Sequence, residues 1–450
     1  MFSRLKTHFG WGLRNPRLFA KKCWSYALFR LRQISTFILR RFLIATAFAY
    51  ARLPRARHKK KLSAKAALLL PTADPGNLGD EAFFFGAVRE LREMGYQRVC
   101  VISFHPEKVW KVPGAETVVL ALHHNPAGSE YIRFVDFASR FTHFFIWGAD
   151  ILDGSQGLGI AIPRFRLANL ASTLGLKTSI CSFSLNSKPA DEVIDGFRNL
   201  DARVVLYARE EVSRERLERY LGPGRVQLSA DVAFLLKPDH TTSLARETAA
   251  WIADQKQAGK IVMGLNINDM LCYYFPQLTP ARLVERYVQA LIELRKRFPN
   301  LAVLHIPHNI HVNPTPHNTD DFALAAIFNE TSPEELQNDS RMLPRTVRAT
   351  EIRAACSYVD FIFSGRMHLT IASLSEGTPV FAVAYQEKFE GLFRHFGLKK
   401  MLVTEADLMD PNATAAFLEN GIRCLPRIRE QIGRRLPVVK DLARLNLVFE

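Results

Sequence analysis

Short apolar runs alternate with helical patterns along this chain, and the alternation occurs in two successive series. The apolar runs of the first series lie at residues 66–71, 98–103, 117–122, 143–147, 178–183 and 204–208. Runs of this length between helical segments are typical of buried strands in a parallel, doubly wound sheet. With 450 residues, 48% of them hydrophobic, the chain is long enough to bury the cores of two such domains.

A polar segment at 237–247 interrupts this rhythm, and a second series follows it. The predicted strands of the second series are 261–266, 301–306, 360–363 and 380–384, and its predicted helices are 243–256, 280–297, 321–330, 347–357, 368–376 and 387–395. We therefore expect an α/β protein with two Rossmann-like domains that face each other across a cleft. The expected divisions are a basic helical arm (1–62), an N-terminal domain (63–238), a C-terminal domain (239–420) and a tail helix (421–450).

The positive charge of the chain is concentrated at its start. Residues 1–61 contain sixteen Lys or Arg and no Asp or Glu, whereas the remaining residues carry 44 basic and 44 acidic side chains. The longest uncharged stretch after Arg41 spans residues 42–51, far fewer than the roughly 20 apolar residues of a membrane span. A basic, aromatic-rich, amphipathic arm is typical of attachment to anionic lipid. A disordered or partner-binding arm and a nucleic-acid-binding arm stay open, although no recognised nucleic-acid module accompanies it.

The six cysteines are scattered along the chain and form no CxxC pair. This pattern favours free thiols in a reducing compartment. We expect a cytoplasmic protein, attached peripherally to the inner face of the membrane if the arm binds lipid.

Residues 361–388, FIFSGRMHLTIASLSEGTPVFAVAYQEK, place three candidate side chains after two predicted strands. Arg366 and His368 lie on the turn between a strand and a helix, where unpaired backbone N–H groups favour anions. Lys388 follows the next strand. Arg and Lys bind carboxylate or phosphate, and His transfers protons near neutral pH. The alternatives are that Arg366 pairs with Glu351 or Asp360 and that Lys388 is a solvated helix residue.

Arg209 is the matching cation in the first series, because it directly follows the apolar run VVLYA and precedes a helix. At the carboxyl end of a strand, it could face the same cleft. Near the start of the series, the turn DPGNLGD lacks the glycine spacing and the Lys of a phosphate-binding loop. There, Asn77 and Asp80 are candidates for holding sugar hydroxyls. Asp80 is alternatively only the N-cap of a helix from residue 81 to about 94.

His308 lies on a loop after a predicted strand, in HIPHNIH (305–311), and is a candidate for lining the site. The spacing of these histidines is a poor match to recognised zinc motifs, so we predict no metal site. No GxSxG motif, Ser-His-Asp order or GxGxxG motif occurs in a suitable context.

Taken together, several blocks resemble the polysaccharide pyruvyl transferase family. They are GNLGDEAFFFGAVRELREMG, YAREEVSRERL, SADVAFLL, IPHN and SGRMHLTIASLSEGTPVFAVAYQEKFEGLF. The resemblance covers residues 66–397 and leaves out the basic arm. The segment WGADILDGSQG (147–157) departs from it, because family members often carry a Gly-rich turn there.

The resemblance implies a fold similar to GT-B glycosyltransferases and transfer of pyruvate from phosphoenolpyruvate onto a sugar as a cyclic ketal. By motif, Arg209, His368 and Lys388 fall on the positions that handle phosphoenolpyruvate, with Arg366 beside them. The reaction it implies needs no metal or organic cofactor. The basic arm suggests a lipid-linked oligosaccharide as the acceptor. Two rival functions are a GT-B glycosyltransferase that uses a nucleotide sugar and a non-catalytic sugar-binding protein on the same fold.

Overall fold

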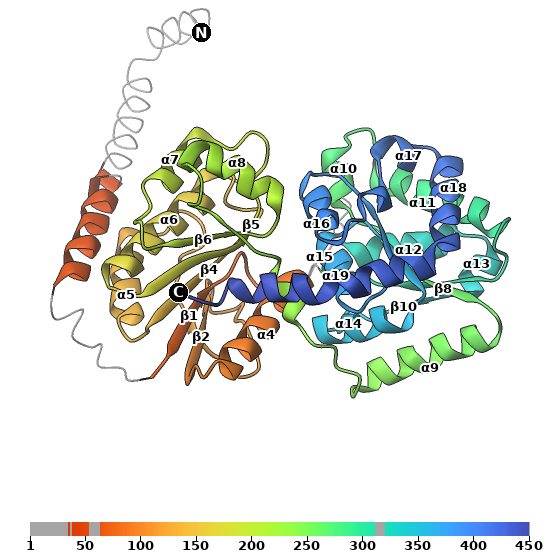
Figure 1. Cartoon of the computed structure of the whole chain (residues 1–450), viewed down its shortest axis with the longest axis horizontal. Coiled ribbons are helices and arrows are strands. Elements are labelled where there is room, and N and C mark those ends of the chain that lie inside the picture. Colours follow the sequence, from red (N-terminus) through yellow and green to blue (C-terminus); the bar gives the residue numbers. More distant parts are fainter. Residues whose placement is uncertain (1–34, 37, 54–63, 311–319, 450) are drawn as a thin grey trace, which may run out of the picture.

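The computed structural model describes residues 35–36, 38–53, 64–310 and 320–449 of the chain. In Figure 1 the described residues form two α/β halves side by side, one for each series of elements. Cys23, most of the basic arm and the end of the HIPHNIH segment lie outside the described residues.

In the described part of the chain, the first domain has a seven-stranded sheet in the order β3-β2-β1-β4-β5-β6-β7, with every neighbouring pair parallel. Its strands are β1 (Ala66–Leu70), β2 (Arg98–Ser103), β3 (Glu116–Val119), β4 (His143–Ala149), β5 (Lys177–Phe183), β6 (Val205–Ala208) and β7 (Gln227–Leu228). Its helices are α4 (Leu78–Glu93), α5 (Gly128–Ala138), α6 (Leu158–Thr173), α7 (Asp191–Arg198), α8 (Glu211–Leu221) and the 3₁₀-helix η1 (Val232–Leu235). The central strands are almost fully buried, as expected for a sheet covered on both faces.

The described part of the second domain has a six-stranded parallel sheet in the order β10-β9-β8-β11-β12-β13. Its strands are β8 (Ile261–Asn266), β9 (Leu301–His305), β10 (Ser340–Met342), β11 (Phe361–Ser364), β12 (Val380–Val383) and β13 (Leu402–Val403). Its helices are α9 (Ser243–Gln257), α10 (Met270–Tyr274), α11 (Pro280–Arg295), α12 (Asp321–Thr331), α13 (Glu334–Asn338), α14 (Ala349–Tyr358), α15 (Met367–Ser375), α16 (Lys388–Phe396), η2 (Lys399–Met401), α17 (Glu405–Met409), α18 (Pro411–Arg423) and α19 (Leu425–Leu445). The predicted class of two Rossmann-like α/β domains is confirmed.

One predicted helix boundary is wrong. Helix α4 begins at Leu78 and not after Asp80, because Asn77 is its N-cap: Asn77 has an extended backbone, and its side chain accepts a hydrogen bond of 2.8 Å from the Gly79 N–H. Asp80 therefore lies in the first turn of the helix.

Helix α19 joins the two domains. In Figure 1 it runs from the second domain back across the first, where the chain ends. Directly after it, the fully buried Asn446 inserts into the first domain. Its Oδ1 accepts from the Ser182 N–H at 2.8 Å, and its Nδ2 donates to the Ala230 carbonyl at 2.9 Å. These bonds tie the last helix to the end of β5 and to the segment that leads into η1.

A helix that includes residues 38–52 packs on the first domain beside α5 (Figure 1). Ala47 and Ala51, one helical turn apart, are fully buried, and Leu43 lies close to Gly128 at the start of α5. The opposite side of this helix leaves Ile38, Leu39 and Phe42 between 57% and 65% exposed. Within the described residues, no helix combines the length and the apolar character needed to cross a bilayer.

We expect Asn446→Ala to lower the free energy of unfolding by about 1–3 kcal/mol, because the buried N–H of Ser182 and carbonyl of Ala230 lose their partner. Urea unfolding of the full chain measures the change. Asn338→Ala, at an exposed helix end, is the matched control and should stay within about 0.5 kcal/mol of the wild type. Equal loss in both variants would contradict the assigned role of Asn446.

Candidate active site

A cleft of about 840 Å³ lies between the carboxyl ends of the strands of the two domains. Six of the seven candidate residues from the sequence line it: Asn77, Arg209, His308, Arg366, His368 and Lys388. This is where ligands bind in open α/β sheets. The structure thus brings together side chains from both domains that lie up to about 310 residues apart in the chain.

Arg209 follows β6 directly and is 3% exposed. Its Nε donates to the Ser184 Oγ at 2.8 Å, and its NH1 donates to the Asp231 Oδ2 at 3.0 Å. Asp231 is equally buried, and its other oxygen accepts from the Ala233 N–H as the N-cap of η1. Burial raises the pKa of Asp231, and Arg209 opposes that effect. Because both charges are desolvated, the loss of either partner would leave the other uncompensated.

His368 is the second residue of α15 and reaches across to the first domain. Its ring meets the Phe83 ring edge-on at 5.1 Å and lies against Gly79, where an added β-carbon would overlap the imidazole. Its Nε2 is 3.8 Å from the Asp231 Oδ2. That nitrogen is buried and has no hydrogen-bond partner in the described part of the chain.

The electrostatic surroundings keep the His368 ring neutral in the free protein. Burial, together with the nearby Arg209, His308 and Lys388, lowers the pKa of His368 well below its ordinary value. A neutral ring with an unpartnered nitrogen can accept a proton or a hydrogen bond from a ligand. Negative charge that binds beside it would raise this pKa again.

Lys388 opens α16 and spans the cleft to the first domain. Its Nζ donates to the Asp150 Oδ2 at 2.6 Å and lies 5.3 Å from the centre of the Tyr385 ring. Burial lowers the pKa of Lys388, but Asp150 outweighs it and the net shift is upward. Burial likewise raises the pKa of Asp150, but Lys388 and Arg209 hold it below its usual range. The alternative prediction of a solvated Lys388 is wrong, because this side chain is only 10% exposed and is paired.

Arg366, the N-cap residue of α15, is held by two carboxylates. Its Nε and NH2 donate to Asp321, with the shortest bond at 2.7 Å, and its NH2 donates to Asp269 at 2.6 Å. The alternative pairing with Glu351 or Asp360 is wrong, since Glu351 caps the Arg348 N–H and Asp360 pairs with Lys256.

The guanidinium groups of Arg209 and Arg366 each have one nitrogen that can donate a hydrogen bond to a ligand. Within the described residues, the NH2 of Arg209 and the NH1 of Arg366 have no hydrogen-bond partner. Both side chains line the cleft. The carboxylate partners therefore orient each fork and stabilise its charge, while one edge of each fork remains available to an anion.

Of the three remaining candidate residues, two line the cleft and one does not. Asn77 lines the cleft while it caps α4, and it forms an isolated bridge with Asn309 of the second domain. His308 also lines the cleft, its ring 6.4 Å from that of His368, and burial lowers its pKa to about 4. Asp80 lies behind the cleft wall, where it accepts a hydrogen bond of 2.5 Å from the Thr72 hydroxyl.

Sequence reasoning missed three residues that shape this site: Asp231, Asp150 and Gly79. Asp231 stands in the SADVAFLL block, and the resemblance of that block to the family is the signal that could have found it. Asp150 directly follows β4, but nothing in the sequence indicates that it meets Lys388. In the described residues, no group of three or more His, Cys, Asp or Glu side chains is arranged to hold a metal ion.

The buried carboxyl of Asp80 should make stability depend on pH. Burial raises its pKa from the usual 3.8 to about 7, against the opposing bond from Thr72. Since the folded state binds this proton more tightly than the unfolded state, the contribution is present below about pH 4 and is lost as pH rises through about 7. The size of the effect is up to about 4 kcal/mol, at about 1.4 kcal/mol per unit of pKa.

Asp80→Asn should remove that contribution while keeping an acceptor for Thr72. The stability of the variant relative to the wild type should therefore increase between pH 5 and pH 7 and level off at higher pH, as measured by urea unfolding. The exposed Asp441→Asn is the control and should give a constant difference. A constant difference for Asp80→Asn as well would show that its pKa is not raised.

Comparisons with known proteins agree with this architecture. Among solved structures, the S. aureus MnaA–UDP structure superimposes with a TM-score of 0.52 and 13% identity, covering 86% of this chain and 98% of that one. A Listeria monocytogenes protein provisionally assigned as a UDP-N-acetylglucosamine 2-epimerase gives 0.51 and 11%, covering 86% and 95%. At such low identity these similarities show a shared two-domain GT-B-like fold.

A search of curated proteins finds no match to this chain. The family model of the polysaccharide pyruvyl transferases matches residues 77–387, which include every candidate site residue except Lys388, the residue directly after the match. The resemblance predicted from the sequence blocks is thereby confirmed, and the chain belongs to the polysaccharide pyruvyl transferase family.

Proposed function

We propose that this protein transfers the pyruvyl group of phosphoenolpyruvate onto a sugar of a polysaccharide or lipid-linked oligosaccharide, as a cyclic ketal, with release of phosphate. The observation that carries the proposal is the convergence of Arg209, His368 and Lys388 from two domains on one cleft. A member of the family acts as a transferase on polysaccharide, and the cleft chemistry suits an anionic three-carbon donor. Phosphoenolpyruvate brings a carboxylate and a phosphate, about three negative charges near neutral pH.

The donor would bind to the unpartnered edges of the cleft cations. The Arg209 NH2 and the Arg366 NH1 offer N–H groups to its carboxylate or phosphate. Lys388 would exchange Asp150 for a phosphate oxygen and stabilise the charge that develops as phosphate leaves. No metal or organic cofactor has a role in this scheme.

His368 would handle the protons. The negative charge of the bound donor raises its pKa, so the ring becomes an acid that protonates the methylene carbon of the donor. The carbon bearing the phosphate then has oxocarbenium character, and a sugar hydroxyl adds to it and gives its proton to the ring. A second hydroxyl of the same sugar displaces phosphate, and its proton leaves with phosphate or water. The products are the ketal and inorganic phosphate.

We expect His368→Asn to lower the rate of phosphate release from phosphoenolpyruvate about 10²–10⁴-fold, the usual contribution of a general acid or base. Gly79→Ala should also lower the rate, because its methyl group displaces the His368 ring without removing it. The measurement is phosphate release by the purified protein with a panel of sugar acceptors.

Two comparisons make this test decisive. His240→Asn, on an exposed residue outside the cleft, should retain the wild-type rate. Phosphoenolpyruvate should raise the melting temperature of the wild type, and UDP-sugars should not. Stabilisation by UDP-sugars alone, or no phosphate release with any acceptor in a broad panel, would contradict the proposal.

We further propose that the protein works at the inner face of the membrane. Support comes from the helix at 38–52, whose outward side carries Ile38, Leu39 and Phe42, and from the basic residues around it in the sequence. Exposed apolar side chains beside Lys and Arg are typical of binding to anionic bilayers. Such binding would bring the cleft close to lipid-linked acceptors.

The double variant Leu39→Glu/Phe42→Glu should reduce co-sedimentation with phosphatidylglycerol vesicles at least tenfold, because two charges replace the apolar contact. The wild type should sediment less with neutral phosphatidylcholine vesicles and less at high salt. Val438→Glu, on the exposed side of α19, is the control and should bind like the wild type. Unchanged sedimentation of the double variant would assign the vesicle binding to another part of the chain.

A further inference from the structure

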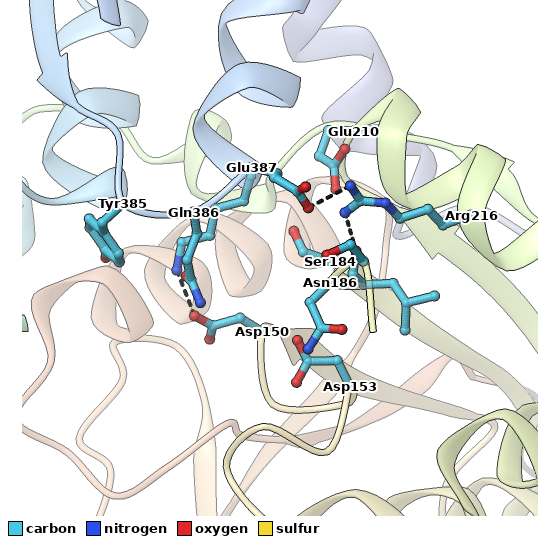
Figure 2. Close-up of a pocket in the computed structure, with 12 residues that line it drawn as sticks. Asp150, Asp153, Ser184, Asn186, Glu210, Arg216, Tyr385, Gln386 and Glu387 are labelled. Carbon is cyan, nitrogen blue, oxygen red and sulfur yellow. Dashed lines mark hydrogen bonds and ion pairs between the residues drawn. The ribbon is translucent and has the colours of Figure 1, made fainter. Parts of the chain in front are cut away.

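A side pocket of about 240 Å³ adjoins the main cleft and shares residues with it, among them Asp150, Asn186, Tyr385 and Lys388. In Figure 2, Asp150, Asp153 and Asn186 lie on one side of this pocket, and Tyr385, Gln386 and Glu387 lie on the other. The first side comes from the carboxyl ends of β4 and β5, and the second follows β12. The pocket therefore spans the two domains next to the cleft cations.

The charges of the side pocket differ in sign from those of the main cleft. Its lining carboxylates are Asp150, Asp153, Glu210 and Glu387, and its lining cations are Arg216 and Lys388. Both cations are already engaged, because Arg216 pairs with Glu387 at 2.5 Å and Lys388 pairs with Asp150. Figure 2 shows the first of these pairs across the top of the pocket. Asp153 and Glu210 form no direct ion pair among the described residues, and Glu210 is instead the N-cap of α8, where it accepts from the Ser213 N–H.

Burial raises the pKa values of Asp153 and Glu210. A further negative group close to them would raise both values, and both cations of the pocket already have a carboxylate partner. The side pocket thus disfavours an anionic ligand, whereas the neighbouring cleft favours one. An anionic substrate would therefore favour the main cleft, and an uncharged substrate would favour the adjoining side pocket.

Two side chains in the pocket carry polar atoms without a partner. Asp153 is 3% exposed, and its Oδ1 accepts from the N–H and the hydroxyl of Ser155, but its Oδ2 has no partner in the described part of the chain. Asn186 accepts from the Lys188 N–H through Oδ1, and its Nδ2 has no partner among the described residues. A buried carboxylate oxygen without a partner in the wall of a pocket can accept a hydrogen bond from a ligand O–H.

An aromatic ring completes the pocket. Tyr385 lines the pocket, and its ring is held by Phe389, edge-on at 5.1 Å, by the Tyr274 ring at 5.0 Å and by the Lys388 Nζ 5.3 Å from its centre. A hydrogen-bond acceptor, an amide donor and a fixed aromatic side chain together match a pyranose ring, which has hydroxyls at its rim and C–H groups on its faces.

We propose that the side pocket is the acceptor subsite and takes an uncharged hexose or N-acetylhexosamine ring in preference to a uronic acid. Asp153 Oδ2 accepts from one ring hydroxyl and Asn186 Nδ2 donates to another. The Asp150–Lys388 pair lines both spaces and marks where the acceptor meets the donor. The name acceptor rests on the proposed function, but the binding of a neutral sugar at this place does not.

The test measures binding of methyl glycosides to the full chain by ligand-observed NMR titration. The probes are the methyl glycosides of glucose, galactose and mannose, together with methyl glucuronide and methyl galacturonide. At least one neutral glycoside should bind, and the uronate of the same configuration should bind at least tenfold more weakly. Binding of no neutral glycoside, or equal affinity for a uronate, would overturn the proposal.

Two conservative variants place the binding in this pocket. Asp153→Asn keeps the oxygen that holds Ser155 and should weaken the neutral glycoside about 10–100-fold, as expected for loss of a charged hydrogen bond. It should also reduce the discrimination against the uronate. Asn186→Asp keeps the acceptor for Lys188, and it should weaken the neutral glycoside and increase that discrimination. Asp441→Asn, 74% exposed on α19, is the control and should match the wild type. Wild-type affinity in both pocket variants would contradict the subsite.

The same samples separate this proposal from the proposed function. Glycoside binding is measured without phosphoenolpyruvate, and stabilisation by phosphoenolpyruvate is measured without glycoside. Neutral-sugar binding with the expected variant effects but no effect of phosphoenolpyruvate would refute the donor and leave the subsite. Phosphoenolpyruvate turnover with unchanged acceptor KM in Asp153→Asn would refute the subsite and leave the donor.

Discussion

Arg209 and Asp231 lie 3.0 Å apart with about 1% of each side chain exposed, and His368 approaches the same carboxylate to 3.8 Å. A guanidinium buried to this degree needs partners for its charge and its N–H groups, and here a carboxylate lies beside it. Asp231 supplies that charge while its second oxygen caps η1. One carboxylate therefore stabilises the cation of the first domain and faces the histidine of the second.

The segment that carries Asp231 is held by both domains. The Arg353 guanidinium of the second domain donates to the Leu236 carbonyl at 2.5 Å, at the end of η1. Gly86 of α4 approaches the Leu236 backbone so closely that a side chain would collide with it. Asn446 holds the Ala230 carbonyl from the other end. These contacts come from distant parts of the chain and from both domains. The position of Asp231 therefore depends on how the two domains are placed relative to each other.

The sequence predicted what depends on local pattern. Apolar runs bounded by turns gave the central strands, and the residues that follow them gave Arg209, Arg366, His368 and Lys388. The short strands β7, β10 and β13 were missed, because two or three residues of an edge strand carry too little periodicity to stand out. The start of α4 was misplaced, since both Asn77 and an aspartate three residues later are good caps, and only the backbone conformation distinguishes them.

What the sequence could not supply is the pairing of charges across the cleft. Asp150 lies 238 residues before Lys388, and Asp321 lies 45 residues before Arg366. Each cation appeared as a free anion-binding group, but each is neutralised in the folded protein. This difference changes the chemistry that the site can perform.

Paired cations bind an anion differently from free ones. Arg366 has two carboxylates close to its charge, and they offset much of its attraction for an anion. Its remaining N–H groups would therefore mainly orient a bound ligand. Lys388 has one carboxylate, and that partner, Asp150, is 30% exposed at the edge of the cleft. In the proposed reaction, exchange of Asp150 for a donor phosphate would leave the Asp150 carboxylate next to the side pocket, free to accept a hydrogen bond from the second hydroxyl of the acceptor. The same ion pair would thus link binding of the donor to orientation of the acceptor.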